Sequence, residues 1–221
     1  MNILWVCIES LVPVNTGGRA GIFHRIRCLS QSNSIYLFFP CDGDEGGRAC
    51  RELGAYCKEI HPVSRGLRSP RQWLELLHLP YTVASRDLDE LAGGVAELLT
   101  RIHIDLVNID FPHMATVLER VPALCNIPTV INMHNVEWGV YRQIARSSTD
   151  PAKRVAYYFD SFRLKSFERW IYQTLPIDAY TFVSSEDMDM YASWLGIPRE
   201  KTRLVPVGGE ASPCGCESDR H

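Results

Sequence analysis

The chain has 221 residues, which is long for one average domain and short for two, so a single α/β domain is the first expectation. Hydrophobic residues make up 46% and charged residues 22%, close to the values of globular proteins, and this excludes a largely disordered chain. The formal net charge of -3 argues against a protein built mainly to bind nucleic acid, because such proteins present a broad basic surface.

The amino terminus is typical of a buried strand and not of a signal peptide. The first eight residues contain no basic side chain, and their apolar run ends at Glu9. No stretch approaches the roughly 18–20 consecutive apolar residues that a membrane-spanning helix needs. We therefore expect a cytoplasmic protein, and a peripheral contact with the inner face of a membrane is compatible with that location.

The eight cysteines are not spaced like a disulfide framework, because they fall singly on expected strands, helices and loops. The one close pair is Cys214-Gly-Cys216, which has only the terminal His221 near it in sequence. We therefore expect unpaired thiols and no metal ion at this pair. We also expect no cofactor. The other six cysteines are Cys7, Cys28, Cys41, Cys50, Cys57 and Cys125.

Apolar runs that alternate with helical stretches predict a parallel sheet. Residues 3–8 and 35–39 are continuous apolar runs, as expected for strands buried on both faces, and Pro40 ends the second run. The other runs cover 104–109, 129–133 and 180–183, with a weaker one at 55–60 and a candidate last strand at 203–207. This order indicates an α/β fold: a Rossmann-like parallel sheet with helices on both faces and right-handed crossovers.

Capping signals mark the ends of two helices. Asp150 offers an N-cap and Pro151 a proline at the first helical position, and a long amphipathic helix follows. Ser184 to Asp187 resembles a capping box, and Gly196 closes the helix that it opens. The apolar stripe of the long helix consists of Val155, Phe159, Phe162, Phe167, Trp170 and Ile171.

Ligands of such sheets bind outside the carboxyl ends of the strands, and Gly17 and Gly18 follow the first strand. They lead into a helix that continues through Leu29. Paired glycines let a backbone approach a ligand closely, and the free N–H groups of a helix start suit a phosphate or diphosphate. A tight turn without a ligand is the alternative. The pair is neither a GxGxxG fingerprint nor a Walker loop, which argues against NAD or ATP.

The loop after the fifth strand carries His134, Asn135 and Glu137. An imidazole there can bind a sugar hydroxyl or move a proton, and the amide or carboxylate can bind hydroxyls or orient the ring. The alternative is a helix start that Asn135 caps. Asp110, after the fourth strand, is equally compatible with a ligand contact and with a helix cap. The remaining histidines before the tail are expected to be structural or on the surface: His24, His61, His78, His103 and His113.

Residues 65–81 combine three arginines with a face rich in tryptophan and leucine. Such a segment suits a membrane surface with anionic head groups or a site for a lipid-linked acceptor. A helix and loop that pack on the domain are the simpler interpretation.

An ordered set of motifs resembles the amino-terminal, acceptor-side domain of family 4 glycosyltransferases with the GT-B architecture. Among these enzymes, the bacterial sugar transferases of polysaccharide and exopolysaccharide assembly are the most similar. The match runs from residue 2 to about residue 207. The motifs are Pro13 with Gly17-Gly18-Arg19, Leu79-Pro80-Tyr81, His134-Asn135-Val136-Glu137, Phe167-Glu168-Arg169, Val183-Ser184-Ser185-Glu186-Asp187 and Val205-Pro206.

The resemblance implies a retaining, metal-independent transfer of a sugar from a nucleotide-sugar donor to a glycan or lipid-linked acceptor. Transferred by position, Gly17, Gly18 and Arg19 would meet the donor diphosphate. His134 and Glu137 would be catalytic, and Asn135 and Asp110 would bind the acceptor. No nucleic acid is implied. Holding the acceptor in line and stabilising the departing diphosphate are the physical requirements of such a reaction.

The chain departs from the family's pattern at the domain junction. The run Pro-Asn-Gly-Val-Asp of the family is replaced by Pro206-Val207-Gly208-Gly209-Glu210. We expect residues 1–207 to form the acceptor-side domain and residues 208–221 a polar tail in place of the donor-binding domain. Because transfer needs a donor site, we expect the isolated chain to be inactive without a donor-binding domain.

Other functions are open at the level of sequence. A non-catalytic module for glycans or lipid-linked sugars would keep the acceptor cleft without the reaction, and a degenerate remnant would keep neither. An unrelated Rossmann-like enzyme for a mononucleotide or phosphosugar is disfavoured by the missing fingerprints. If a neighbouring domain is absent, the carboxyl edge and the long helix should carry an exposed apolar patch or an oligomer contact.

Overall fold

The computed structural model describes residues 1–65, 70–86 and 88–206. The expected polar tail 208–221, with the pair Cys214 and Cys216, lies outside the described residues, as do residues 66–69 of the segment 65–81.

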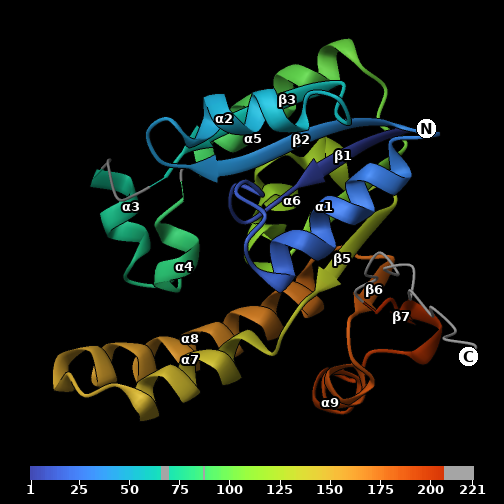
Figure 1. Cartoon of the computed structure of the whole chain (residues 1–221). Coiled ribbons are helices and arrows are strands. Elements are labelled where there is room, and N and C mark those ends of the chain that lie inside the picture. The colour runs from blue at the N-terminus through green and yellow to red at the C-terminus, as the bar shows by residue number, and fades with distance from the viewer. Residues whose placement is uncertain (66–69, 87, 207–221) are drawn as a thin grey trace, which may run out of the picture.

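One parallel seven-stranded sheet forms the centre of the described chain, with the strand order β3-β2-β1-β4-β5-β6-β7 (Figure 1). Every neighbouring pair is parallel. The strand order reverses beside β1, where ligand sites of such folds lie. The strands are β1 (Asn2–Val6), β2 (Ser34–Cys41), β3 (Glu59–Ser64), β4 (Leu106–Asp110), β5 (Thr129–Met133), β6 (Ala179–Phe182) and β7 (Thr202–Leu204).

Helices connect the strands, as expected for parallel pairing. The α-helices are α1 (Gly17–Leu29), α2 (Glu45–Leu53), α3 (Pro70–Glu75), α4 (Tyr81–Ala84), α5 (Leu88–Arg101), α6 (Thr116–Arg120), α7 (Glu137–Ser147), α8 (Pro151–Thr174) and α9 (Ser185–Leu195). The short 3₁₀ helices are η1 (Pro112–Ala115), η2 (Pro122–Asn126) and η3 (Arg199–Lys201). Within the described residues, no helix combines the length and the apolar character that crossing a membrane requires.

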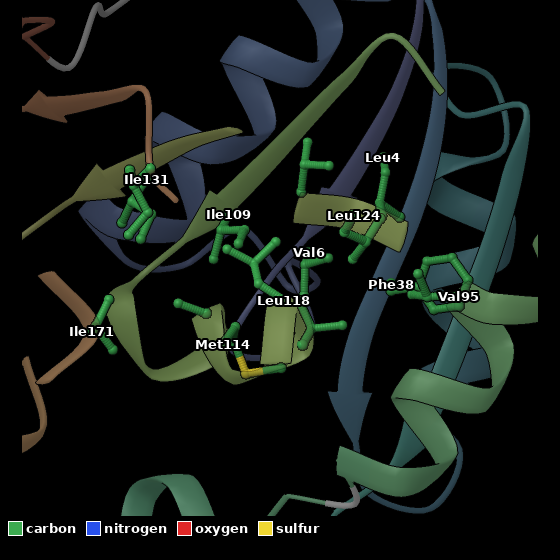
Figure 2. Close-up of a cluster of buried hydrophobic side chains, with 14 of the residues drawn as sticks. Leu4, Val6, Phe38, Val95, Ile109, Met114, Leu118, Leu124, Ile131 and Ile171 are labelled. Atoms are coloured by element: carbon green, nitrogen blue, oxygen red, sulfur yellow. The ribbon is translucent and has the colours of Figure 1, made fainter. Parts of the chain in front are cut away.

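Two hydrophobic cores lie on opposite faces of the sheet. Alternate residues of a strand point to opposite faces, so Leu4 and Val6 of β1 enter one core while Ile3 and Trp5 enter the other. Helices α5, α6, α8 and α9 cover the first core, part of which Figure 2 shows, and α1 and α2 cover the second. This arrangement confirms the predicted α/β class with helices on both faces.

The predicted helix caps are confirmed. The carboxylate of Asp150 accepts hydrogen bonds from the N–H groups of Ala152 and Lys153 at the start of α8. The hydroxyl of Ser184 accepts from the N–H of Asp187 at the start of α9. Gly196 ends α9 in the left-handed conformation, with φ of 71°, which favours glycine.

Two strand predictions were wrong at prolines. The third strand spans 59–64 and not 55–60, and it contains Pro62 because β3 is an edge strand, where a missing N–H is tolerated. The second strand continues through Pro40 to Cys41. The carbonyl of Phe38 accepts from Cys7, so Pro40, two residues later, also faces the side of β1, which has already ended.

The long helix was predicted correctly, but the first half of its apolar stripe is not buried. Figure 1 shows α7 and α8 side by side as a hairpin that projects from the sheet. Phe167 and Ile171, near the end of α8, join the core. Val155, Phe159 and Phe162 are exposed.

Candidate functional site

The candidate site lies where the central strands β1, β4 and β5 end. These strands are neighbours in the sheet, so their carboxyl ends meet at one edge. Asp110 is the last residue of β4, and His134 is the first residue after β5. Their positions in the sequence predicted both residues at this edge, and the structure brings their side chains into contact.

Asp110 is a fully buried carboxylate that accepts several donors. Its Oδ2 accepts from the indole Nε1 of Trp5 and lies 3.6 Å from the Sγ of Cys7. Its Oδ1 accepts from Nη2 of Arg25 at 3.2 Å. Asp110 does not cap a helix, because Phe111 is the N-cap of η1 and no side chain caps it. The cap alternative for Asp110 was therefore wrong.

The carboxylate of Asp110 contacts the imidazole of His134. Its Nε2 lies 2.9 Å from Oδ1 of Asp110 and 3.1 Å from Nη2 of Arg25. A carboxylate only accepts and a guanidinium only donates, so the shorter contact assigns the proton to Nε2 of His134. Both donors then converge on Asp110. This tautomer leaves Nδ1 as an acceptor, and Nδ1 has no hydrogen-bond partner among the described residues.

Phe111 covers the other side of the imidazole. Its ring stacks on His134 with 4.5 Å between the centroids and an interplanar angle of 24°. The backbone of Phe111 has φ of 70°, a conformation that is uncommon and strained for a bulky residue. Such strain is typical of functional sites, where the surrounding structure maintains it. Phe111 and Asp110 together fix the position of the His134 ring.

Asn135 and Glu137 form a second contact in the same loop. Nδ2 of Asn135 donates to Oε1 of Glu137 at 3.3 Å. Helix α7 begins at Glu137 with Val136 as its N-cap and without a side-chain cap, so the cap alternative for Asn135 was wrong. Burial raises the pKa of Glu137, while the hydrogen bond from Asn135 and the charge of Arg86 oppose this shift.

Arg86 is a buried cation beside Glu137 that no pattern in the sequence indicated. Its Nε donates to the carbonyl of Ile8 at 3.1 Å, just after β1, and its Nη1 is buried without a partner. Burial, followed by the charge of Arg65, lowers the pKa of Arg86 to about 10. Burial also lowers the pKa of His113 to about 3, with Arg86 as a further cause, so His113 is a neutral core residue.

Gly17 and Gly18 form the first turn of α1, after the N-cap Thr16. A Cβ atom added to either glycine would meet no atom within 4 Å, and neither residue has a positive φ. The fold itself therefore does not require glycine here. Arg19 is bound by both oxygens of Glu9, at 3.0 Å and 2.9 Å, and this hydrogen bonding raises the pKa of Arg19.

The structure joins the predicted residues into groups and not into one contact set. Asp110 and His134 contact each other, and Asn135 contacts Glu137. Gly17 and Gly18 form no hydrogen bond with His134 among the described residues, but α1 links the two positions, because Arg25 of the same helix reaches the imidazole. Among the described residues, no group of three or more His, Cys, Asp or Glu side chains is arranged to hold a metal ion.

No protein-family model matches the chain, and no curated protein matches it. Solved structures do. Sucrose-phosphate synthase from Thermosynechococcus elongatus is 15% identical with a TM-score of 0.58, and the match covers 95% of this chain and 48% of the synthase. A second, shorter chain of that synthase is 15% identical with a TM-score of 0.53, with 95% and 91% covered.

A plant enzyme shows the same likeness. UGT2 of Phytolacca americana, complexed with UDP-2-fluoro-glucose and pterostilbene, is 11% identical with a TM-score of 0.55, and 97% of this chain and 56% of UGT2 are covered. The chain thus spans about half the length of the synthase and of UGT2. At these identities the likeness concerns the fold, which is the Rossmann-like α/β fold of GT-B glycosyltransferases.

Proposed function

We propose that the chain is the acceptor-side half of a retaining glycosyltransferase of the family 4, bacterial polysaccharide type. It would transfer a sugar from a nucleotide-sugar donor to a glycan or lipid-linked acceptor in the cytoplasm. The observation that carries the proposal is the contact of Asp110 with His134 at the carboxyl edge of a GT-B-type sheet. An oriented imidazole at that edge is suited to contact a sugar.

His134 is proposed to bind the transferred sugar through Nδ1, which accepts a hydroxyl proton while Nε2 donates to Asp110. Asp110 is fully buried, so its proposed role shifts from acceptor binding to the positioning of His134. Fixed orientation of a polar group lowers the reorganisation that the reaction requires.

Glu137 and Asn135 are proposed to meet the acceptor. Burial raises the pKa of Glu137, and a carboxyl group with a raised pKa suits proton exchange with an acceptor hydroxyl. Asn135 holds Oε1 of Glu137 in place. Arg86 lies beside Glu137 and opposes the shift, so it keeps the carboxylate form accessible.

Gly17 and Gly18 are proposed to approach the donor diphosphate with the free N–H groups of the α1 start. Both Cα atoms face open space, so packing within the fold does not require glycine at either position. A ligand that approaches the backbone would explain the two glycines. Arg19 already shares its charge with Glu9, so we propose that it orders the loop between β1 and α1 beside the diphosphate.

The proposed reaction also needs a donor-binding unit, in the same polypeptide or in a separate one. We therefore propose that residues 1–207 form the acceptor-side domain and that the 221-residue chain alone binds UDP- or GDP-sugars weakly and transfers no sugar. Isothermal titration of both donors against the 221-residue chain tests this division of labour. Tight donor binding by this chain alone would contradict the assignment to the acceptor side.

The role of His134 is tested once a donor-binding unit is supplied. His134→Ala should lower the transfer rate by about 10²-fold or more, as expected for loss of a positioned polar group. His103→Ala is a matched control, because the His103 side chain is 88% exposed and distant in sequence from the site. Equal rates for both variants would remove His134 from the proposed mechanism, whereas a non-catalytic binding module would show no transfer with any variant.

A further inference from the structure

The hairpin of α7 and α8 carries an apolar surface that no other part of the described chain covers. Four side chains on one stripe of α8 are exposed: Val155 at 68%, Tyr158 at 47%, Phe159 at 63% and Phe162 at 46%. They line a groove of 540 Å³ together with Ala145 of α7. Leaving four such side chains in water costs free energy in a monomer, and contiguous exposed apolar patches mark interaction sites.

The segment between α3 and α4 extends the same surface. A second groove, of 730 Å³, has Leu77 and Leu79 on one side and Phe159 and Phe162 on the other. Leu77 is 77% exposed. Figure 1 shows α3, α4 and the hairpin at the same end of the molecule. Segments far apart in sequence therefore build one apolar surface, which we call the hairpin surface.

Cations flank the first groove of the hairpin surface. Arg146 and Arg154 stand at the edges of the first groove. Residues 137–174 contain seven basic residues, in a chain whose net charge is -3. They are Arg142, Arg146, Lys153, Arg154, Arg163, Lys165 and Arg169.

Among the described acidic residues of the hairpin, Asp160 pairs with one of these cations, Arg163, at 3.8 Å, and the other six cations have no carboxylate partner on the hairpin. Residues 137–174 contain four acidic side chains, and three of them, Glu137, Asp160 and Glu168, are buried. The exposed one is Asp150, which caps α8. The outer face of the hairpin is therefore basic and apolar, although the whole chain is slightly acidic.

We infer that the hairpin surface docks on an anionic membrane surface. Phenylalanine, tyrosine and valine side chains would enter the boundary between head groups and acyl chains, and the arginine and lysine side chains would contact the anionic head groups. A second copy of the chain fits this surface less well. Two copies in a symmetric dimer would bring the same cations together, and like charges repel.

Helix α8 connects the hairpin surface with the candidate site. Glu168, on the last turns of α8, accepts from the hydroxyl of Tyr191 at 2.7 Å, and that hydroxyl lies 3.5 Å from the carbonyl of Asn135. Docking through the other end of α8 would hold the loop after β5 at a fixed height above the membrane. The inference does not depend on sugar transfer, because vesicle binding needs neither donor nor acceptor.

Flotation of the 221-residue chain with lipid vesicles tests the inference. We expect binding to vesicles of phosphatidylcholine with about 30% phosphatidylglycerol, and weaker binding to phosphatidylcholine alone. Raising the salt from about 0.1 M to about 1 M should weaken binding, because salt screens exposed charges. Equal binding to both kinds of vesicle, or none to either, would overturn the inference.

Two variants separate the apolar from the ionic contribution. Phe159→Ser with Phe162→Ser should abolish most vesicle binding. Arg146→Gln with Arg154→Gln should weaken it about thirtyfold, which corresponds to about 1 kcal/mol for each cation near an anionic surface. All four side chains are exposed, so both variants should keep the far-UV circular dichroism of the native chain.

Matched controls lie on the opposite side of the molecule. Arg51→Gln with Lys58→Gln removes two exposed cations near α2 and β3, and it should leave binding unchanged. A loss of binding equal to that of the arginine pair on the hairpin would overturn the assignment to this surface. Analytical ultracentrifugation provides a second readout: a dimer that the phenylalanine variant dissociates would assign the surface to a second copy instead.

Discussion

Oδ1 of Asp110 lies 2.9 Å from Nε2 of His134. Asp110 ends strand β4, and His134 directly follows the neighbouring strand β5. The carboxylate is fully buried, and the imidazole is nearly so. Strand pairing therefore sets this contact, since Asp110 and Asn132 are register partners and His134 follows two residues later. Because strand pairing fixes which nitrogen of His134 carries the proton, substitutions at this contact should have measurable effects.

Asp110→Asn should release the His134 tautomer and destabilise the fold. The amide of asparagine can donate as well as accept, so the proton on Nε2 is no longer required. The buried indole of Trp5 and the half-buried guanidinium of Arg25 lose a charged acceptor, and we expect a cost of about 1–3 kcal/mol in the free energy of unfolding. ¹⁵N chemical shifts of the imidazole and urea unfolding measure the two effects.

Asp189→Asn is the control for this variant. Asp189 pairs with Arg199 at 3.5 Å, but both side chains are largely exposed, at 62% and 85%. Such a pair contributes little, so we expect a change below about 0.5 kcal/mol. A wild-type ring protonated on Nδ1, or an unchanged tautomer in the Asp110 variant, would contradict the positioning role of Asp110.

Gly17→Ala and Gly18→Ala should each stabilise the fold by about 0.5–1 kcal/mol, because alanine restricts the unfolded chain and favours the helix. The added Cβ meets no atom within 4 Å. Thermal unfolding measures this gain. If the glycines allow the donor diphosphate to approach the backbone, the same variants should weaken binding of the nucleotide sugar once a donor-binding unit is supplied.

Gly94→Ala is the opposite case and serves as the control. Its Cβ would lie 2.9 Å from the ring of Phe38, so we expect a loss of about 1–3 kcal/mol. Destabilisation by the Gly17 and Gly18 variants as well would mean that the first turn of α1 needs glycine for its own structure. The functional argument for the pair would then fail.

Glu168→Gln should remove part of the pH dependence of stability. Burial raises the pKa of Glu168 to about 8, against a usual value near 4.5, so the folded chain keeps this proton where the unfolded chain has lost it. Stability from this group is present at low pH and falls as the pH rises from about 4.5 to about 8, by at most about 1.4 kcal/mol per pH unit.

Glutamine resembles the protonated carboxyl group, so the stability of the variant should fall less over that range. Urea unfolding at about pH 5 and pH 8 gives the difference between variant and wild type, in which the other titrating groups cancel. Glu186→Gln, at an exposed position of α9, is the matched control. Parallel pH profiles of Glu168→Gln and the wild type would show that Glu168 is ionised in the fold.

Much of the fold could be predicted because its signals are local. Residues 129–133 were predicted as a strand with the bounds that the structure has, and Asp150 and Ser184 cap the helices that they were expected to cap. The third strand was misplaced because a proline suggests a break, and only the sheet order shows that β3 is at an edge. Edge position is a tertiary property.

The site could be predicted only where it lies at strand ends. His134 and Asp110 could be predicted because ligands of parallel sheets bind at the carboxyl ends of the strands, where both residues lie. Arg25 lies in the middle of α1, where helical periodicity does not tell which distant carboxylate its guanidinium reaches. Phe111 adopts a positive φ without the glycine or asparagine that usually indicates one, and Arg86 lies outside any strand end.

Thiol labelling at neutral pH should divide the cysteines by burial. Cys28 and Cys50 are exposed and should react rapidly with an alkylating reagent. Cys7 is buried beside Asp110. Burial, and then the negative charge of Asp110, raise the pKa of the Cys7 thiol well above its usual value. Burial also raises the pKa of Cys57 to about 12. A thiolate is the reactive form, so both should stay unmodified until the chain unfolds. Peptide mass mapping identifies which cysteines are labelled. Rapid labelling of Cys7 in the folded chain would show that solvent reaches the buried residues around Asp110.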